Sequence, residues 1–211
     1  MNRIAIRRED GCGSGRCVPL VPDDVMELVA EGVPLAIQPS EHRVYCDAAY
    51  EAAGAAVRED IDRAHLILGM APIPEELVDG PRAWMCFSHL AGGAPERLDL
   101  LRALLDAGAT LLDYALIADE EGVPLLSFRG EVPGSGGRPS SEESTVAACR
   151  LFSAELKSLL PSLASADFEA STLAASGLHP ALRRACIVWR GDLVNDHGRL
   201  AKILQEHGKH E

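Results

Sequence analysis

Short apolar runs alternate along this chain with segments whose apolar residues recur at helical spacing. Apolar runs bounded by turn residues predict buried strands, and the helical period predicts amphipathic helices. Strands are expected at Arg3–Arg7, Pro34–Gln38, His65–Gly69, Ala83–Phe87, Thr110–Tyr114, Pro124–Phe128 and Ala185–Trp189. Helices are expected to begin at Pro22, Asp47, Pro95, Ser140 and Leu193, the fourth running to Leu160 before Pro161. This alternation is typical of an α/β fold, and we predict a single Rossmann-like parallel sheet flanked by helices.

One segment departs from the alternation. Gly130–Ser141 reads GEVPGSGGRPSS, and its glycine, serine and proline content is typical of a connector. The chain then divides into an N-terminal part, 1–128, a linker, 129–141, and a C-terminal return segment, 142–211. We expect all three to belong to one domain, because 211 residues suffice for one well-buried core and are few for two.

Charge and hydropathy narrow the class of protein. The chain has 32 acidic and 20 basic side chains, which give a net charge of −12. Phosphate backbones and anionic membranes attract basic surfaces, so we expect neither nucleic acid nor a membrane as a partner. No apolar run is long enough for a membrane span, and the opening MNRIAIRRED has no signal core. We therefore expect a cytoplasmic protein, in which six cysteines do not indicate a disulfide framework.

Five stretches together carry a family resemblance. They are IAIRRED with VPLVPDDVMELV, QPSEHRVYCDAAYEAAGA, LILGMAPIPEELV, WMCFSHLAGG and LLDYALIADEEGVPLLSF. In this order they resemble the N-terminal lobe of the lysine-ketoglutarate reductase/saccharopine dehydrogenase group, within the alanine dehydrogenase/transhydrogenase superfamily. Gly177–Leu204 resembles the return segment of the same lobe. In that family an NAD(P)-binding domain lies between the two parts, whereas here the linker takes its place.

The resemblance also implies which site residues this chain has and which it lacks. His89 matches the catalytic histidine of the family, which transfers protons. The position of the family's substrate-binding arginine is Cys17, with Arg16 one residue earlier, and the position of its lysine is Ala71. No Gly-x-Gly-x-x-Gly motif follows a strand, so we expect no nucleotide cofactor. The glycine-rich Gly11–Gly15 fits a plain loop better than a phosphate-binding loop.

Candidate site residues follow from the expected sheet as well, because ligands of open α/β sheets bind beyond the carboxyl ends of the strands. His89 is the expected general acid/base, since imidazole suits proton transfer near neutral pH. Cys17 would be a nucleophile if a histidine lay beside it. Asp113 would orient His89, and Tyr114 would donate a hydrogen bond. The expected substrate-binding residues are Arg7, Arg16, Met70 and Ser88. We expect no metal, because the spacing of Cys12 and Cys17 departs from common zinc sites.

Three functions remain open at this point. The first is a cofactor-independent enzyme that acts on an amino acid, keto acid or imine, with His89 as general acid/base. The second is a non-catalytic binding or partner module. The third is the substrate subunit of an NAD(P)-dependent dehydrogenase completed by another chain. In each case a homodimer or a partner protein could cover the face where the cofactor domain packs in the family.

Overall fold

The computed structural model describes residues 1–9, 16–93, 95–126, 142–194 and 198–207, and its centre is one eight-stranded sheet. The strand order is β3-β2-β1-β4-β5-β6-β7-β8. The first six strands in sequence are parallel: β1 (Ile4–Ile6), β2 (Leu35–Ile37), β3 (Ala56–Val57), β4 (Leu66–Leu68), β5 (Ala83–Cys86) and β6 (Thr110–Asp113). β7 (Cys186–Trp189) and β8 (Asp192–Leu193) extend the sheet antiparallel. The predicted α/β class is confirmed, with a mostly parallel sheet.

Helices cover both faces of this sheet because successive strand side chains point to opposite faces. In β1, Ile4 and Ile6 join the core on one face and Ala5 joins the core on the other. The first face is covered by α1 (Pro22–Ala30), α2 (Asp47–Ala52), α4 (Glu142–Lys157), α5 (Leu160–Ser165) and α6 (Pro180–Arg184). The second is covered by α3 (Leu98–Asp106) and α7 (Gly198–His207). No helix among the described residues is long and apolar enough to cross a membrane.

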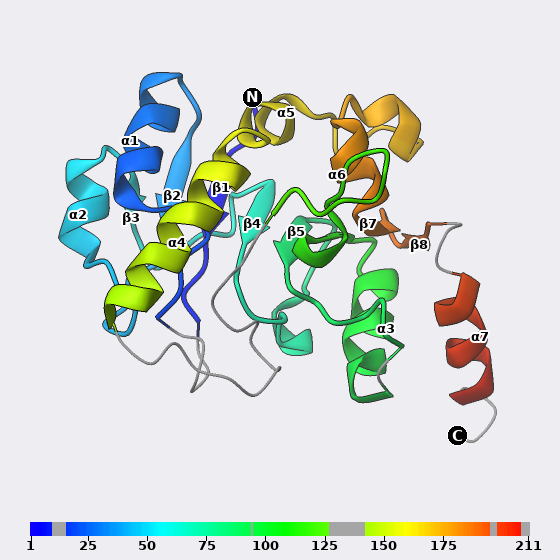
Figure 1. Cartoon of the computed structure of the whole chain (residues 1–211). Helices are drawn as coiled ribbons and strands as arrows, with labels where there is room; N and C mark the ends of the chain where they lie inside the picture. Colours follow the sequence, from blue (N-terminus) through cyan, green and yellow to red (C-terminus); the bar gives the residue numbers. More distant parts are fainter. Residues whose placement is uncertain (10–15, 94, 127–141, 195–197, 208–211) are drawn as a thin grey trace.

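The helix α4 brings the C-terminal part of the chain onto the N-terminal part. Its residues Ala148, Cys149, Phe152 and Leu156 are buried at helical spacing, so one stripe of the helix faces the core. Figure 1 shows α4 lying across the sheet in front of β1, beside α1. A segment distant in sequence therefore supplies much of the cover over β1, the strand that leads into the candidate site.

One expected strand is wrong, and one expected helix starts later than predicted. Pro124–Phe128 is not a strand of the sheet over its described part, where Pro124 makes only an isolated bridge with Ala118. Leu193 lies in β8, and the last helix begins at Gly198. Arg190 and Gly191 have φ values of 51° and 83°, which suit a tight hairpin between β7 and β8. The short β3 and β8 gave no recognisable sequence signal.

Helix boundaries differ from the expectation in two places. The fourth expected helix does not run to Leu160, because α4 ends at Lys157 and α5 begins at Leu160. Pro161 lies in the first turn of α5, where a missing N–H costs nothing, so it begins a helix instead of ending one. A 3₁₀ turn at Pro95–Arg97 precedes α3, and the expected start at Ser140 lies outside the described residues.

Gly191→Ala should destabilise the protein more than Gly122→Ala. Both glycines have φ near +80°, but a Cβ at Gly191 would lie 2.8 Å from the Leu105 carbonyl oxygen, whereas a Cβ at Gly122 would meet nothing within 4 Å. We expect losses in unfolding free energy of roughly 1–2 kcal/mol for Gly122→Ala and roughly 3 kcal/mol or more for Gly191→Ala. Urea unfolding measures both, and equal losses would contradict the packing of this hairpin on the end of α3.

Candidate functional site

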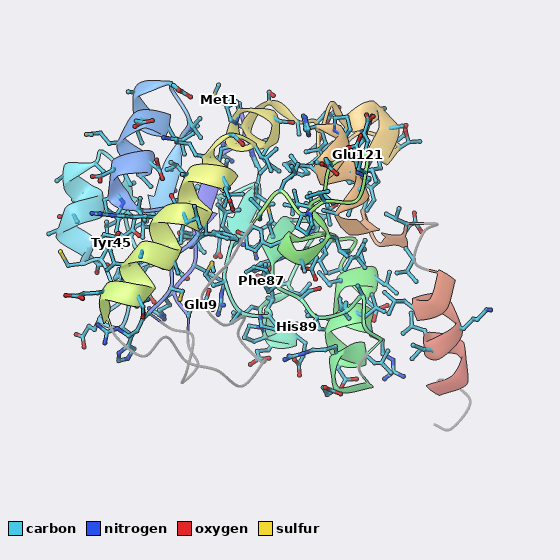
Figure 2. The ribbon with its side chains drawn as sticks, in the orientation of Figure 1. Met1, Glu9, Tyr45, Phe87, His89 and Glu121 are labelled. Carbon is cyan, nitrogen blue, oxygen red and sulfur yellow. The ribbon has the colours of Figure 1, made fainter. Side chains whose placement is uncertain are left out.

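The ends of β1, β4, β5 and β6 bring most of the expected site residues to one edge of the sheet. Arg7 follows β1, Met70 lies near the end of β4, and Ser88 and His89 follow β5. Asp113 ends β6, directly opposite Cys86 in the sheet register. Figure 2 shows Glu9, Phe87 and His89 on this same side of the molecule. Parallel strands explain the convergence, since their carboxyl ends meet at a common edge.

Arg7 and Glu9 form a buried ion pair at this edge. The Arg7 Nη1 atom lies 3.2 Å from Glu9 Oε2, and the two side chains are 4% and 6% exposed. Glu9 also accepts hydrogen bonds from the backbone N–H groups of Met70, at 2.6 Å, and Ala71, at 3.2 Å. A Cβ on residue 69 would lie 3.3 Å from Arg7 Cδ and 3.3 Å from Glu9 Oε1, so a side chain there would crowd the ion pair and glycine does not. Arg7, expected to bind substrate, is thus engaged within the protein by Glu9.

Asp113 holds the chain that leaves β5. Its carboxylate accepts a hydrogen bond from the Ser88 N–H at 3.1 Å and another from the Ser88 hydroxyl. The second oxygen accepts from the Ala115 N–H at 2.9 Å, and Ser88 Oγ in turn accepts from the Leu90 N–H at 3.2 Å. Burial raises the pKa of Asp113, while the bonds from Ser88 and Ala115 and the nearby His89 favour its ionised form. The expected Ser88 and Asp113 therefore meet, and both are fully buried.

His89 is the partly exposed residue between these fixed neighbours. Ser88 and Leu90 on either side of it are buried, whereas the His89 side chain is only partly covered. Its backbone has φ of 57°, in the left-handed region that a non-glycine residue rarely adopts. Such a conformation persists where surrounding contacts impose it, and it is found at functional sites more often than elsewhere. The hydrogen bonds around Asp113 supply those contacts.

Tyr114 lies in an aromatic cluster with Phe87 and Phe152. The ring centroid of Tyr114 is 5.2 Å from that of Phe87 and 5.1 Å from that of Phe152, both in edge-to-face geometry. Its hydroxyl is buried without a hydrogen-bond partner, and burial raises the pKa of Tyr114 well above its usual value. Phe152 comes from α4, so the return segment closes this side of the site. A neutral, buried hydroxyl of this kind can donate a hydrogen bond to a group that reaches it.

Cys17 lies against a second thiol instead of a histidine. Its side chain is hydrogen-bonded to Cys149 of α4, and both residues are buried. The hydrogen bond with Cys149 and burial raise the pKa of Cys17, which disfavours the thiolate that a nucleophile requires. The hydrogen bond from Cys17 lowers the pKa of Cys149. Cys149 Sγ also accepts a hydrogen bond from the Val18 N–H at 3.5 Å.

The other expected residues lie at different depths. Met70 is fully buried in the core and contributes its backbone N–H to Glu9. Arg16 is exposed, and its carbonyl oxygen accepts a hydrogen bond from the Val44 N–H at 2.9 Å, which ties the loop before α1 to the loop after β2. Cys12 and the linker 129–141 lie outside the described residues. Within the described part of the chain, no group of His, Cys, Asp or Glu side chains could hold a metal ion.

Three polar residues of this edge escaped sequence reasoning. Glu9 and Cys149 were overlooked because nothing local marks them as partners of residues 70 and 17. Arg43, after β2, is a buried cation 5.4 Å above the ring of Tyr50, and its Nη1 atom has no hydrogen-bond partner. Burial lowers the pKa of Arg43. Glu9 in the opening IAIRRED was the one available signal of a buried ion pair, since a charge so close to a buried strand needs a partner.

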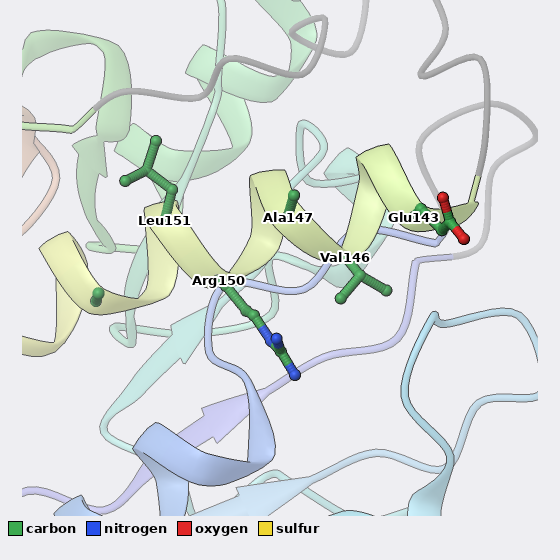
Figure 3. Close-up of a pocket in the computed structure, with 6 residues that line it drawn as sticks. Glu143, Val146, Ala147, Arg150 and Leu151 are labelled. Atoms are coloured by element: carbon green, nitrogen blue, oxygen red, sulfur yellow. The ribbon is translucent and has the colours of Figure 1, made fainter.

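Hollows in the surface lie away from these residues. One is lined by the outer face of α4, where Glu143, Val146, Ala147, Arg150 and Leu151 gather (Figure 3). Another lies near the amino ends of β1 and β2, where Ile4, Pro34 and Leu35 contribute. Neither is lined by an expected site residue. Of the residues expected to form the site, His89 and Arg16 have partly or fully exposed side chains, and the others are buried.

The family follows from sequence comparison. The family described as "Alanine dehydrogenase/PNT, N-terminal domain" matches residues 5–132, more than half of the 211 residues. The chain therefore belongs to the alanine dehydrogenase/PNT N-terminal domain family. This confirms the superfamily predicted from the five stretches, and the match ends inside the linker.

Individual relatives are similar to the same part of the chain. The mitochondrial alpha-aminoadipic semialdehyde synthase of Bos taurus is 34% identical over 134 residues, which cover 64% of this chain and 14% of that protein. The alanine dehydrogenase of Halomonas elongata is 37% identical over 125 residues, 56% of this chain and 33% of that protein. A solved L-alanine dehydrogenase aligns with 57% of this chain and 35% of its own, at 22% identity and a TM-score of 0.47. The chain thus spans only a small part of the relatives that it matches.

Glu9→Gln should destabilise the fold far more than Glu59→Gln. Glu9 neutralises a buried arginine. Glu59 instead pairs with Arg8 at the surface, where the Arg8 side chain is 40% exposed and the Glu59 side chain 63% exposed. Breaking a buried pair leaves an uncompensated charge, so we expect a loss of roughly 3 kcal/mol for Glu9→Gln and less than about 1 kcal/mol for Glu59→Gln. Chemical denaturation of both variants tests this. A small loss for Glu9→Gln would mean that the pair is not enclosed as described.

The raised pKa of Asp113 predicts a pH dependence of stability. The stability contributed by its protonated form is fully present below the unfolded-state pKa, ordinarily 3.8, and is lost as the pH rises through the higher folded-state pKa. The unfolding free energy of wild type minus that of Asp113→Asn should therefore fall with rising pH across this acid range and then level off. Denaturant unfolding at a series of pH values measures this difference. A difference that rises with pH would contradict the direction of the shift.

Proposed function

We propose that this chain is a substrate-binding lobe that acts on an amino acid, keto acid or imine without a nucleotide cofactor, with His89 as general acid/base. The observation that carries the proposal is the way His89 is held. It is partly exposed at the carboxyl end of β5, in a left-handed conformation, between residues fixed by Asp113. Holding one imidazole in a costly backbone conformation is consistent with a site that needs it there.

Proton transfer at a carbon–nitrogen bond is the chemistry that this arrangement favours. A neutral imidazole can remove a proton from a water molecule or from a carbon next to a C=N bond, and the resulting imidazolium can return the proton to nitrogen. Asp113 and Ser88 would position His89 through the backbone, because their hydrogen bonds end on the N–H groups of residues 88 and 90. The buried Asp113 carboxylate would also favour the transient positive charge on His89.

Substrate binding would depend on the exposed cation and the backbone at this edge. Arg16 is exposed in the loop before α1 and would donate hydrogen bonds to a substrate carboxylate, and Arg7 is buried against Glu9. The residues present do not fit a nicotinamide dinucleotide, since the sequence contains no Gly-x-Gly-x-x-Gly loop between a strand and a helix. No step of this proposal therefore involves hydride transfer.

A non-catalytic binding module is the second candidate, and the burial of the site favours it. Arg7, Met70, Ser88 and Tyr114 are all at most 5% exposed, so few polar groups remain to touch a ligand. The substrate subunit of a two-chain dehydrogenase is the third candidate. This candidate is favoured by the length of the bovine relative, of which the matched part of this chain covers only 14%. A nucleotide-binding domain would then come from a second chain. These candidates differ in whether a ligand binds, whether His89 matters and whether NAD(P)H is needed.

Ligand binding and turnover of His89 variants separate the three candidates. His89→Asn and His89→Gly remove the imidazole but accept the left-handed backbone, and His42→Ala, at an exposed position, is the control. Thermal unfolding is followed with lysine, saccharopine, glutamate, 2-oxoglutarate, alanine and cyclic imines, each with and without NAD(P)H. We expect stabilisation by one amino acid, keto acid or imine alone. Conversion of that ligand should fall by about 10²–10⁴-fold in both His89 variants, because proton transfer by one side chain is worth about that much.

Other outcomes point to the other candidates. Ligand stabilisation that is equal in wild type and both His89 variants, without turnover, would favour the binding module. Stabilisation that appears only with NAD(P)H would favour the dehydrogenase subunit. Sedimentation velocity of the same samples gives the oligomeric state, which we predict to be a homodimer unless a partner protein is present.

A further inference from the structure

Two buried thiols from distant parts of the chain meet beside the candidate site. Cys17 lies in the loop that leads into α1, and Cys149 lies on the inward stripe of α4. Their side chains are hydrogen-bonded to each other, and the Val18 N–H donates to Cys149 Sγ at 3.5 Å. The Val21 N–H donates likewise to Ser153, one helical turn further along α4. Backbone and side-chain contacts thus hold the loop and the helix in register at the point where the sulfur atoms meet.

This pair differs from the other described cysteines. Cys86 and Cys186 are fully buried in β5 and β7, and burial raises the pKa of each thiol. Cys46 is exposed at the start of α2. Only Cys149 has hydrogen-bond donors aimed at its sulfur from both a thiol and a backbone N–H, and these lower its pKa. Among the described residues, Cys149 is therefore the cysteine whose sulfur accepts a backbone hydrogen bond beside a second thiol.

We propose that Cys17 and Cys149 are an oxidation site, at which a peroxide converts the two thiols into a disulfide that fastens α4 to the loop before α1. The Cys149 thiolate attacks one oxygen of the peroxide, the O–O bond breaks, and Cys149 becomes a sulfenic acid with release of water or an alcohol. The sulfur of Cys17 then attacks Cys149, the S–O bond breaks, and the Cys17 proton leaves with the departing oxygen as water. For hydrogen peroxide, two thiols and one peroxide give one disulfide and two water molecules.

A small oxidant suits this position better than a protein disulfide. Cys149 is fully buried and Cys17 is 7% exposed, so a large reagent cannot approach either sulfur. We infer that a small oxidant enters beside Cys17, which keeps a small exposed fraction and directly follows the exposed Arg16. The bond would close a loop of more than a hundred residues and so restrict the unfolded chain strongly. This proposal is independent of His89 and of any substrate.

Oxidation of the reduced protein with equimolar hydrogen peroxide tests the proposal. We expect wild type to lose two hydrogen atoms in intact mass and to give a Cys17–Cys149 peptide after non-reducing digestion. The thermal midpoint should rise by roughly 5–15 °C and return to its starting value with dithiothreitol. Cys17→Ser should stop at a sulfenic acid on Cys149, seen as a gain of one oxygen atom in intact mass. Cys186→Ser, the matched buried control, should form the disulfide as wild type does.

Two results would overturn the proposal. One is a peptide map in which Cys17 and Cys149 of peroxide-treated wild type both remain open to alkylation after unfolding. The other is a disulfide that joins either residue to a different cysteine. Because Cys149→Ser could perturb the buried face of α4, the conclusion rests on wild type and on Cys17→Ser, whose fold circular dichroism can verify.

Discussion

The carboxylate of Asp113 fixes the geometry of the whole carboxyl edge. Asp113 ends β6 opposite Cys86 of β5, and its oxygens bind the backbone of Ser88 and of Ala115. One buried acid thus determines where the chain goes after two neighbouring strands. These hydrogen bonds compensate part of the free-energy cost of burying the charged carboxylate. Because the compensation is incomplete, the pKa of Asp113 is raised. His89, with φ of 57°, lies between two residues whose N–H groups take part in these hydrogen bonds.

A second buried acid closes the same edge from the other side. Glu9 neutralises Arg7 and accepts hydrogen bonds from the N–H groups of Met70 and Ala71, so two residues expected to bind substrate, Arg7 and Met70, are engaged within the protein. The Cys17–Cys149 thiol pair lies at the same edge. Of the residues expected to form the site, His89 and Arg16 are the ones whose side chains are partly or fully exposed.

The return segment completes both the core and the site. Phe152 of α4 packs on Tyr114 and Phe87, and Cys149 meets Cys17. Cys149, Phe152 and Leu156 of α4 belong to the same buried core as Ile4 and Ile6 of β1, and apolar burial is worth about 25 cal/mol for each Å². The N-terminal and C-terminal parts of the chain therefore share one core.

The sequence alone determined the α/β class, five of the six parallel strands, the family and the position of His89 at a strand end. These features rest on local patterns: apolar runs, helical periods and short motifs are all readable within about twenty residues. The tertiary structure decided the rest. It made β7 antiparallel and added β8, ended α4 at Lys157, paired Arg7 with Glu9, and brought Cys17 to Cys149. Those outcomes depend on contacts between residues far apart in the chain, and on the need of each buried charge or thiol for a partner, which no local pattern encodes.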